Sequence, residues 1–448
     1  MLPDVALLEI FHFYVDAGER IWAWYTLVHV CRKWRNLVFW SPQRLNLRLY
    51  CTDSTPVRET IDAWPPLPIH VECLGAETHG KDNIIAALEH NDRIRGLYLY
   101  GYPGSEMDKL LEAMQQPFPA LTYLALQVGY SGETAPVVPA SFLGGSAPQL
   151  QRLELYRIPF PGLPKLLLSA IHLVELTLEF IPHSGYFSPE AMVTALAVLT
   201  SLENLHVEFD SPRSRPDQKT RRPPPPTRTL LPTLKDLRFV GVSEYLDDLV
   251  SRIDAPLLGK LKILFFHQLI YDTPQLTQFI NRTPKFKAYD EARVEFPFSR
   301  VSVTTIDSAL GLGILCTQSD WQVSSLAQVC SSGFIPAVKH LYIIREPASS
   351  PFWQDDIESC QWLEVLHQLT AVKELYISRV FTPGIARTLE ELVGGRVTEV
   401  LPALQTLFLE EELPSGPVEE SIGKFVSARQ LVGFPVAVSR WERSILDH

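Results

Sequence analysis

The chain has 448 residues, of which 46% are hydrophobic and 20% are charged, and its formal net charge is -11. This is the composition of an ordinary globular protein, and the negative charge argues against nucleic acid or an anionic membrane as the main partner. The cysteines lie far apart and form no Cys-x-x-Cys pair, so neither a zinc site nor a dense disulfide framework is expected. No apolar run approaches about 18 residues, and therefore we expect no membrane span.

Residues 2–40 predict two short amphipathic helices. Pro3 and Asp4 suit the first turn of a helix, because proline lacks an N–H and aspartate complements the positive end of the helix dipole. A second helix is expected over residues 28–38, with Val30, Trp34, Leu37 and Val38 on one face. A unit of this size can bury only a thin core of its own. Its broad apolar arcs therefore indicate a partner, which is either the rest of the chain or another protein.

Two motifs in this segment carry a resemblance to a known family. The pairing of Leu-Pro-Asp-(x)3-Leu-x-Ile-Phe at residues 2–11 with Val-Cys-Arg-Lys-Trp-Arg at residues 30–35 resembles the F-box, in the form common at the start of fungal F-box proteins. The resemblance implies that this segment docks on the Skp-family adaptor of a cullin-RING ubiquitin ligase. The alternative is a helical pair packed on an ordinary core. Carried over by position, the residues that would form or support the adaptor contact are Leu2, Pro3, Leu8, Ile10, Phe11, Val30, Cys31 and Trp34.

Beyond residue 42, strand and helix patterns alternate. Strands are expected at residues 45–49 and 69–71, and helices at residues 56–64 and 81–88. From Ile94 onward an apolar residue, two variable ones, leucine, one variable residue and another apolar residue recur at intervals of roughly 23 to 34 residues. The copies begin at Ile94, Leu121, Leu150, Leu173, Leu202, Leu234, Leu261, Val338, Val372 and Leu404.

This recurrence is typical of a leucine-rich-repeat solenoid, in which each copy buries its apolar positions by stacking on its neighbours. The predicted fold class is therefore α/β, with a short N-terminal helical F-box followed by an irregular solenoid that has parallel strands on its concave face and helices on its convex face. The asparagine that usually stands three places after the last apolar residue is missing from every copy. We therefore expect irregular repeats with full helices on the convex side.

Two segments interrupt the repeats. Residues 211–228 are rich in proline and basic residues, and we expect a disordered excursion there because no apolar side chain could anchor them. Residues 289–336 contain strand-like pieces at 292–296, 301–305 and 314–317 and a helical stretch at 321–329, which predict two divergent repeats. A helix at residues 421–432 would cap the last repeat. The predicted domains are thus an F-box module at 1–42, a solenoid at 43–435 and a tail or cap at 436–448.

The sequence contains no pattern that indicates catalysis. We find no G-x-S-x-G, H-E-x-x-H or Walker-type loop, and we expect no catalytic residue, no metal ligand and no cofactor. The carboxylate pairs Asp247-Asp248 and Asp355-Asp356 and the run at residues 410–412 are expected to be solvated charge, because adjacent side chains point in different directions.

The candidate binding residues lie between the repeat leucines, where alternate side chains face the solvent side of the strands. Aromatic rings supply buried area at protein interfaces and charges fix the register. The alternative for any one of these aromatic residues is that it merely covers a neighbouring strand. The residues predicted to hold a protein substrate are Tyr98, Tyr100, Glu154, Tyr156, His206, Arg238, Tyr342, Tyr376 and Phe408.

These patterns predict a non-catalytic substrate adaptor of a cullin-RING ubiquitin ligase. The F-box would hold the Skp-family adaptor, and the solenoid would hold an unidentified protein substrate; nucleic acid and membranes are not expected as partners. The expected location is the cytoplasm, the nucleus or both, because a basic leader is missing and the cysteines read as reduced thiols. A ligase-independent scaffold that uses the same solenoid is the second hypothesis, and a small-molecule enzyme is the third.

Overall fold

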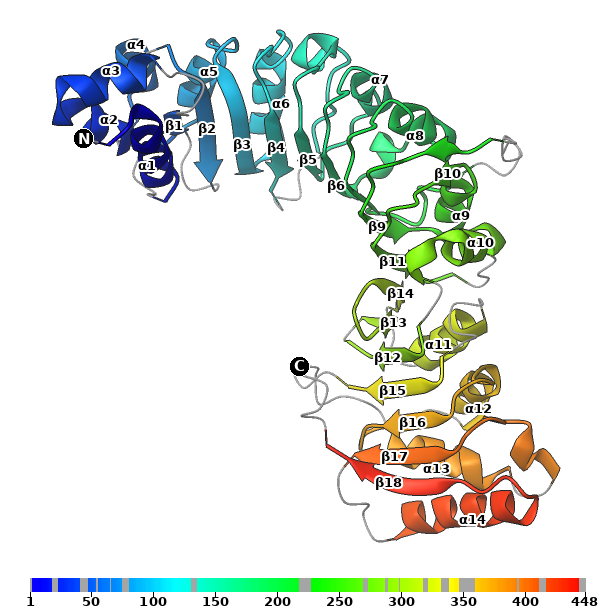
Figure 1. Cartoon of the computed structure of the whole chain (residues 1–448). Coiled ribbons are helices and arrows are strands. Elements are labelled where there is room, and N and C mark those ends of the chain that lie inside the picture. Colours follow the sequence, from blue (N-terminus) through cyan, green and yellow to red (C-terminus); the bar gives the residue numbers. More distant parts are fainter. Residues whose placement is uncertain are drawn as a thin grey trace. The chain divides into compact units, whose positions relative to one another are not determined.

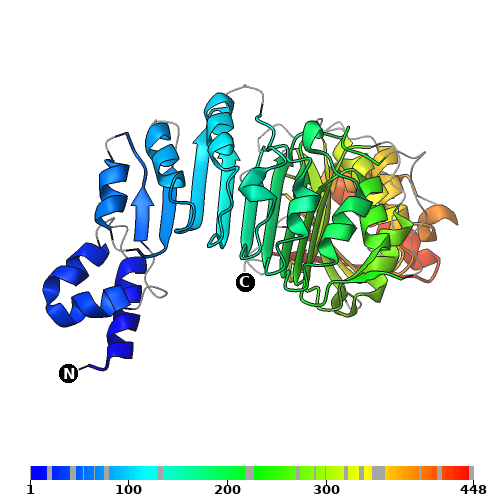
Figure 2. The ribbon, with the colours of Figure 1, turned by 90° about the horizontal axis from the view of Figure 1, so that it is seen from above.

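The computed structural model describes residues 2–17, 23–40, 47–53, 55–64, 66–74, 80–129, 135–216, 227–268, 273–286, 289–297, 299–316, 321–331, 338–345, 359–392, 395–410 and 416–442. The chain divides into two compact units. Unit 1 comprises residues 1–214 and 229–234, and unit 2 comprises residues 215–228 and 235–448. Both are mixed α/β, and in each a mostly parallel sheet carries helices along one face (Figures 1 and 2).

Unit 1 begins with three helices, α1 (Asp4–Ala17), α2 (Ala23–Val30) and α3 (Arg32–Trp40), which pack against one another (Figure 1). The prediction of a single helix over residues 28–38 is wrong, because α2 ends at Val30 and α3 begins at Arg32, with Cys31 between them. The junction is held by Arg35, whose side chain donates to the Val28 carbonyl at 3.0 Å and whose backbone N–H donates to the Cys31 carbonyl at 3.0 Å. As a result Val30 is exposed, while Val38 is fully buried.

The sheet of unit 1 contains seven strands that are parallel and lie side by side in chain order. The register aligns one leucine from each of five successive strands, and all five are almost fully buried: Leu97, Leu124, Leu153, Leu176 and Leu205. Because strand side chains alternate between faces, the intervening residues form the opposite face, which we call the open face. The strands are β1 (Leu47–Tyr50), β2 (Ile69–Leu74), β3 (Ile94–Tyr102), β4 (Tyr123–Val128), β5 (Arg152–Tyr156), β6 (Glu175–Ile181) and β7 (Asn204–Phe209).

The helices of unit 1 cover the leucine face of the sheet. They are shorter than the sequence predicts, since α7 has five residues and the described part of the β4–β5 connection contains only a 3-10 turn. Pro159 and Pro161 lie just before α7, and Gly144 and Gly145 lie in the 3-10 turn; both residue types disfavour the interior of a helix. The other elements are α4 (Val57–Ala63), α5 (Lys81–Leu88), α6 (Gly104–Ala113), η1 (Phe142–Gly145), α7 (Leu163–Leu167), η2 (His183–Gly185), α8 (Pro189–Leu196) and β8 (Thr229–Leu230).

The sheet of unit 2 follows the order β9, β11, β14, β13, β12, β15, β16, β17 and β18. In chain order these strands are β9 (Asp236–Gly241), β11 (Lys260–Phe266), β12 (Glu291–Glu295), β13 (Arg300–Thr305), β14 (Leu310–Leu315), β15 (His340–Ile344), β16 (Glu374–Ile377), β17 (Thr406–Glu410) and β18 (Ala437–Trp441). The helical elements and one short strand are α9 (Ser243–Ser251), β10 (Ile253–Asp254), α10 (Pro274–Arg282), η3 (Pro284–Phe286), α11 (Trp321–Ser331), α12 (Ser359–Gln368), α13 (Thr382–Glu390), η4 (Gly395–Thr398) and α14 (Pro417–Leu431).

The sheet of unit 2 is not wholly parallel, which corrects the expectation that the strands of the solenoid, including the two divergent repeats at residues 289–336, are all parallel. Strand β13 runs antiparallel to both β12 and β14. The links on either side of β13 are hairpins, too short for the crossover that parallel neighbours require. In the second hairpin the Asp307 carboxylate accepts from the Thr305 hydroxyl at 2.7 Å and from the Ala309 N–H at 3.0 Å.

The prediction for the repeat that begins at Leu261 is wrong about which residues of its strand, β11, are buried. Strand pairing aligns Leu261 with Leu237 and Ile263 with Phe239, and it is Leu261, Ile263 and Phe265 that are buried. The apolar spacing is met twice here, once from Leu258 and once from Leu261. Burial selects the first, so Leu264 and Phe266 lie on the face opposite these buried residues, which is the open face of unit 2.

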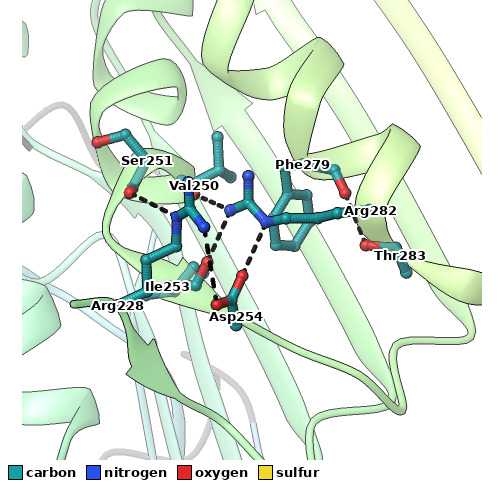
Figure 3. Close-up of polar contacts among 8 residues, drawn as sticks. All are labelled: Arg228, Val250, Ser251, Ile253, Asp254, Phe279, Arg282 and Thr283. Carbon is teal, nitrogen blue, oxygen red and sulfur yellow. Dashed lines mark hydrogen bonds and ion pairs between the residues drawn. The ribbon is translucent and has the colours of Figure 1, made fainter. Parts of the chain in front are cut away.

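The ends of the basic, proline-rich segment at residues 211–228 are anchored, contrary to expectation. In unit 1 Ser214 is fully buried, with its hydroxyl 3.4 Å from Nδ1 of His183. In unit 2 Arg228 donates to the Ser251 carbonyl at 3.3 Å and lies 4.0 Å from the Asp254 carboxylate, which also binds Arg282 at 2.7 Å (Figure 3). Polar anchoring replaces the missing apolar contact. Residues 217–226, on which the prediction of disorder also falls, lie outside the described residues.

The acidic pair Asp247-Asp248 is buried, so the prediction of solvated charge is wrong there. Asp247 accepts from the backbone N–H groups of Gln275 and Leu276 at 2.8 and 3.0 Å, which caps the first turn of α10. Asp248 pairs with Arg252 at 3.2 Å. Residues 355–356 and 411–412 lie outside the described residues, and Glu410 is half-buried, accepting from the Arg379 N–H at 2.9 Å.

The last strand of unit 2, β18, pairs in parallel with β17 and lies within the predicted tail. Helix α14 precedes it and packs on α13. The division of the chain at residues 42 and 435 stays a prediction. Among the described residues, no helix combines the length and the apolar character that crossing a membrane requires.

Candidate functional site

The small core of the three N-terminal helices is centred on Phe11. This side chain is fully buried, and its ring lies 4.7 Å from that of Trp34. The other buried apolar residues of the three helices are Leu7, Leu8, Leu27, Val28 and Val38. An ion pair between Asp4 and Lys33, at 2.8 Å, links α1 to α3 on the surface. The apolar residues inside this core set the geometry of the helices and do not themselves offer a contact surface.

The eight residues predicted to contact an adaptor fall into two groups. Leu8 and Phe11 are buried and Trp34 is half-buried, so these three support the helices from within. Leu2, Pro3, Ile10, Val30 and Cys31 are exposed. Further apolar side chains that the motif does not name are also exposed on these helices: Val5, Phe13, Tyr14, Phe39 and Trp40.

The open face of unit 1 carries a group of tyrosines on β3, β4 and β5. Tyr98 and Tyr123 are stacked, with ring centroids 4.1 Å apart, and Tyr100 lies 6.5 Å from Tyr156. Register places the small, fully buried Ala125 between Tyr98 and Glu154. The small side chain leaves room above it for larger neighbours to converge.

These neighbours converge on the carboxylate of Glu154. The Tyr123 hydroxyl donates to Oε1 at 2.8 Å, and the Tyr156 hydroxyl donates to Oε2 at 3.3 Å. Burial and the negative charge of Glu154 raise the pKa of both phenols well above the ordinary value, and burial also raises the pKa of Tyr100. For Tyr98, burial and the charge of Glu72 raise the pKa to about 12. The phenols are therefore protonated donors at neutral pH.

A second polar group on this face joins β6 and β7. Nδ1 of His206 lies 3.0 Å from the Glu179 carboxylate, and its Nε2 lies 3.7 Å from that of Glu208. All three side chains are half-buried. Burial, followed by repulsion from Glu179 and Asp210, raises the pKa of Glu208 to about 7. Negative charge is thus concentrated at this end of the face.

In unit 2 the predicted aromatic residues form a ladder across β15, β16 and β17. Tyr342 and Tyr376 are stacked at 4.2 Å, and Tyr376 and Phe408 at 4.3 Å with nearly parallel rings. The indole of Trp441, on β18, lies edge-on to Tyr376 at 5.7 Å and to Tyr342 at 6.1 Å. Trp441 is buried and donates from Nε1 to the Ile377 carbonyl at 3.3 Å. The chain thus covers part of this ladder itself.

The ladder also has a carboxylate beside it. Glu374 accepts from the Tyr376 hydroxyl at 2.9 Å and lies 2.8 Å from Nδ1 of His340. Burial opposes ionisation of this carboxyl, but the hydrogen bonds from His340 and Tyr376 outweigh it and lower the pKa of Glu374. Burial, and then the hydrogen bond to Glu374, raises the pKa of Tyr376.

Arg238 does not join this ladder, since β11, β14, β13 and β12 separate β9 from β15. It belongs to a basic patch in which Asp236 binds Arg238 at 3.5 Å and Lys260 at 3.6 Å. Lys262 is aligned with Arg238 in the register. Burial, and then repulsion by Lys260 and Arg238, lowers the pKa of Lys262. The predicted substrate-binding residues therefore divide into four groups, two in unit 1 and two in unit 2.

Several residues of these groups were not predicted. Tyr123, Arg152, His340 and Glu374 each directly precede the middle leucine of their repeat, so the same alternation, extended by one step, would have placed them on the open face. Trp441 lies outside the repeats, and no pattern in the sequence indicated its position.

The described residues contain no group of three or more His, Cys, Asp or Glu side chains that could hold a metal ion. No protein-family model and no curated protein sequence matches this chain.

Proposed function

We propose that this chain is the substrate-recognition subunit of a cullin-RING ubiquitin ligase. Helices α1–α3 form an F-box that docks on a Skp-family adaptor, and the repeats form a leucine-rich-repeat solenoid whose open strand face holds a protein substrate. The chain performs no bond chemistry in this scheme. It raises the local concentration of a target lysine near the ubiquitin-loaded enzyme.

The observation that carries the proposal is the exposed apolar surface of the N-terminal helices. Ile10 is 49% exposed, Phe13 75% and Val30 54%, within a unit whose buried core is centred on Phe11. Exposed apolar side chains gathered on a small helical unit are typical of a docking surface. This surface coincides with the two sequence motifs that resemble the F-box.

Two features of the repeats support the second half of the proposal. The leucines of successive strands align and are buried under the helices, as stacked repeats require. The open faces present tyrosines and charged groups, a composition that is enriched at protein interfaces.

Capture of a purified Skp-family adaptor by the full-length chain tests the proposal. The variant to use is Ile10→Asp with Phe13→Asp, because both side chains are exposed and the core around Phe11 is untouched. Val137→Asp is the matched control, since Val137 is 53% exposed elsewhere in unit 1. We expect the double variant to lose adaptor capture, while its circular dichroism and the capture by the control are unchanged.

If the wild-type chain captures no adaptor, or the double variant captures it as well as the wild type, the ligase function is wrong. Retention of protein partners by such a chain would then favour the ligase-independent scaffold.

A further inference from the structure

The open face of unit 1 has an excess of negative charge among aromatic rings. Its carboxylates outnumber its guanidinium groups, and strands β1–β7, all of them described, contain no lysine. The acidic residues are spread over four strands, with tyrosines between them. The charged residues of this face are Glu72, Glu154, Glu175, Glu179 and Glu208 against Arg48 and Arg152.

The geometry fixes these carboxylates in place. Phenol hydroxyls hold Glu154 from two sides, and His206 lies between Glu179 and Glu208. Preorganised carboxylates of this kind bind a cation without a large loss of side-chain entropy. Burial is the main cause of the raised pKa of Glu208, and repulsion from Glu179 and Asp210, which a bound cation would relieve, adds to it.

The face already binds one guanidinium of its own. Arg152 lies over the ring of Tyr123, with its Cζ 5.4 Å from the ring centroid, and its Nε is 2.7 Å from the Glu175 carboxylate. This pairing of an aromatic ring with a carboxylate suits arginine in particular, since the planar guanidinium stacks on rings and hydrogen-bonds carboxylates at the same time.

We propose that the open face of β3–β7 receives an arginine-rich, extended segment of a protein partner. Its guanidinium groups stack on the tyrosines and bind the carboxylates of Glu154, Glu179 and Glu208. The inference rests on the proposed function and adds to it the chemistry of the bound substrate.

An acidic or phosphorylated segment fits this face poorly. The tyrosine hydroxyls could donate to an anion, but Glu154 already accepts from those of Tyr123 and Tyr156, and the nearby carboxylates would repel it. Such a segment is complementary to the basic patch around Asp236 in unit 2, not to the face of unit 1.

Fluorescence anisotropy with the full-length chain tests the inference. The probe is a labelled decapeptide in which arginine and serine alternate, and the reference peptides carry glutamine or glutamate in place of arginine. We expect only the arginine peptide to bind, with an affinity that falls as salt rises because the attraction is electrostatic. Glu179→Gln with Glu208→Gln should weaken binding on the order of tenfold, since two half-buried charge partners are removed.

Glu419→Gln with Glu420→Gln is the matched control, because it removes the same charge from the exposed surface of α14. Equal binding of the arginine and glutamine peptides, or equal weakening by the two double variants, would overturn the inference. Adaptor capture by the same preparations tests the proposed function separately, so that either can fail alone.

Discussion

The open faces of the two units share one local pattern, a tyrosine two residues after a glutamate, but use it differently. In unit 1 the Tyr156 hydroxyl donates to Glu154 at 3.3 Å, and in unit 2 the Tyr376 hydroxyl donates to Glu374 at 2.9 Å. The second donor to the glutamate is Tyr123 in unit 1, whereas Glu374 lies against His340 in unit 2.

The difference lies in what surrounds each pair. In unit 2 the buried indole of Trp441 packs edge-on against the ladder, which ties β18 to β15 and β16. In unit 1 the tyrosines surround the carboxylate of Glu154. On β6 and β7 of the same face, burial and then repulsion from Glu179 and Asp210 raise the pKa of Glu208. Aromatic residues at equivalent strand positions are thus covered by the chain's own indole in unit 2 and surround a carboxylate in unit 1.

The largest effect on stability is expected from truncating Trp441, which packs against the aromatic ladder of unit 2. Trp441→Ala should lower the free energy of unfolding by about 3 kcal/mol, the usual loss when a buried tryptophan is truncated. Trp40→Ala, at a tryptophan that is 82% exposed, is the matched control and should change little. Urea unfolding followed by circular dichroism measures both. A loss below about 1 kcal/mol for Trp441→Ala would mean that the ladder is not a stabilising element.

A smaller effect on the free energy of unfolding, one that depends on pH, is expected from replacing Glu208 in unit 1. Because the pKa of Glu208 is raised from 4.5 to about 7 in the folded chain, its protonated form is favoured there. The contribution of the protonated carboxyl to the free energy of unfolding is fully present below about pH 4.5 and is lost as pH rises through about 7. Its total is on the order of 2 to 3 kcal/mol. Glu208→Gln should therefore gain stability relative to the wild type between pH 5 and pH 8.

Thermal unfolding at several pH values measures this difference. Glu112→Gln, at an exposed position on α6, is the control and should show a difference from the wild type that does not change with pH in this range. If Glu208→Gln behaves like this control, the crowding of carboxylates on β6 and β7 has no energetic consequence.

The smallest effect is expected from deleting single phenol hydroxyls. Tyr123→Phe and Tyr376→Phe each remove one hydrogen bond to a carboxylate, at 2.8 and 2.9 Å, and each should lower the free energy of unfolding by about 1.5 kcal/mol. Tyr14→Phe, at an exposed position, should be neutral. A loss in only one of the two units would break the parallel between the faces.

The alternation of strand residues was readable from the sequence, and so were most of the residues on the open faces. Tyr98, Tyr100, Glu154 and Tyr156 are half-buried where the repeat leucines beside them are buried. The register at β11 was not readable, because Leu258 and Leu261 both begin an acceptable match and only the pairing with β9 selects between them.

What the sequence determined by itself is the local periodicity: which strands bury leucine and which residues between them reach solvent, since the side-chain period of a strand is two. Only the tertiary structure decided which strands are neighbours. The antiparallel pairing of β13, the hydrogen bond from Tyr123 on β4 to Glu154 on β5, and the packing of Trp441 on Tyr342 and Tyr376 all join residues from different strands. Such contacts depend on pairing and register across the sheet, which no pattern within one strand contains.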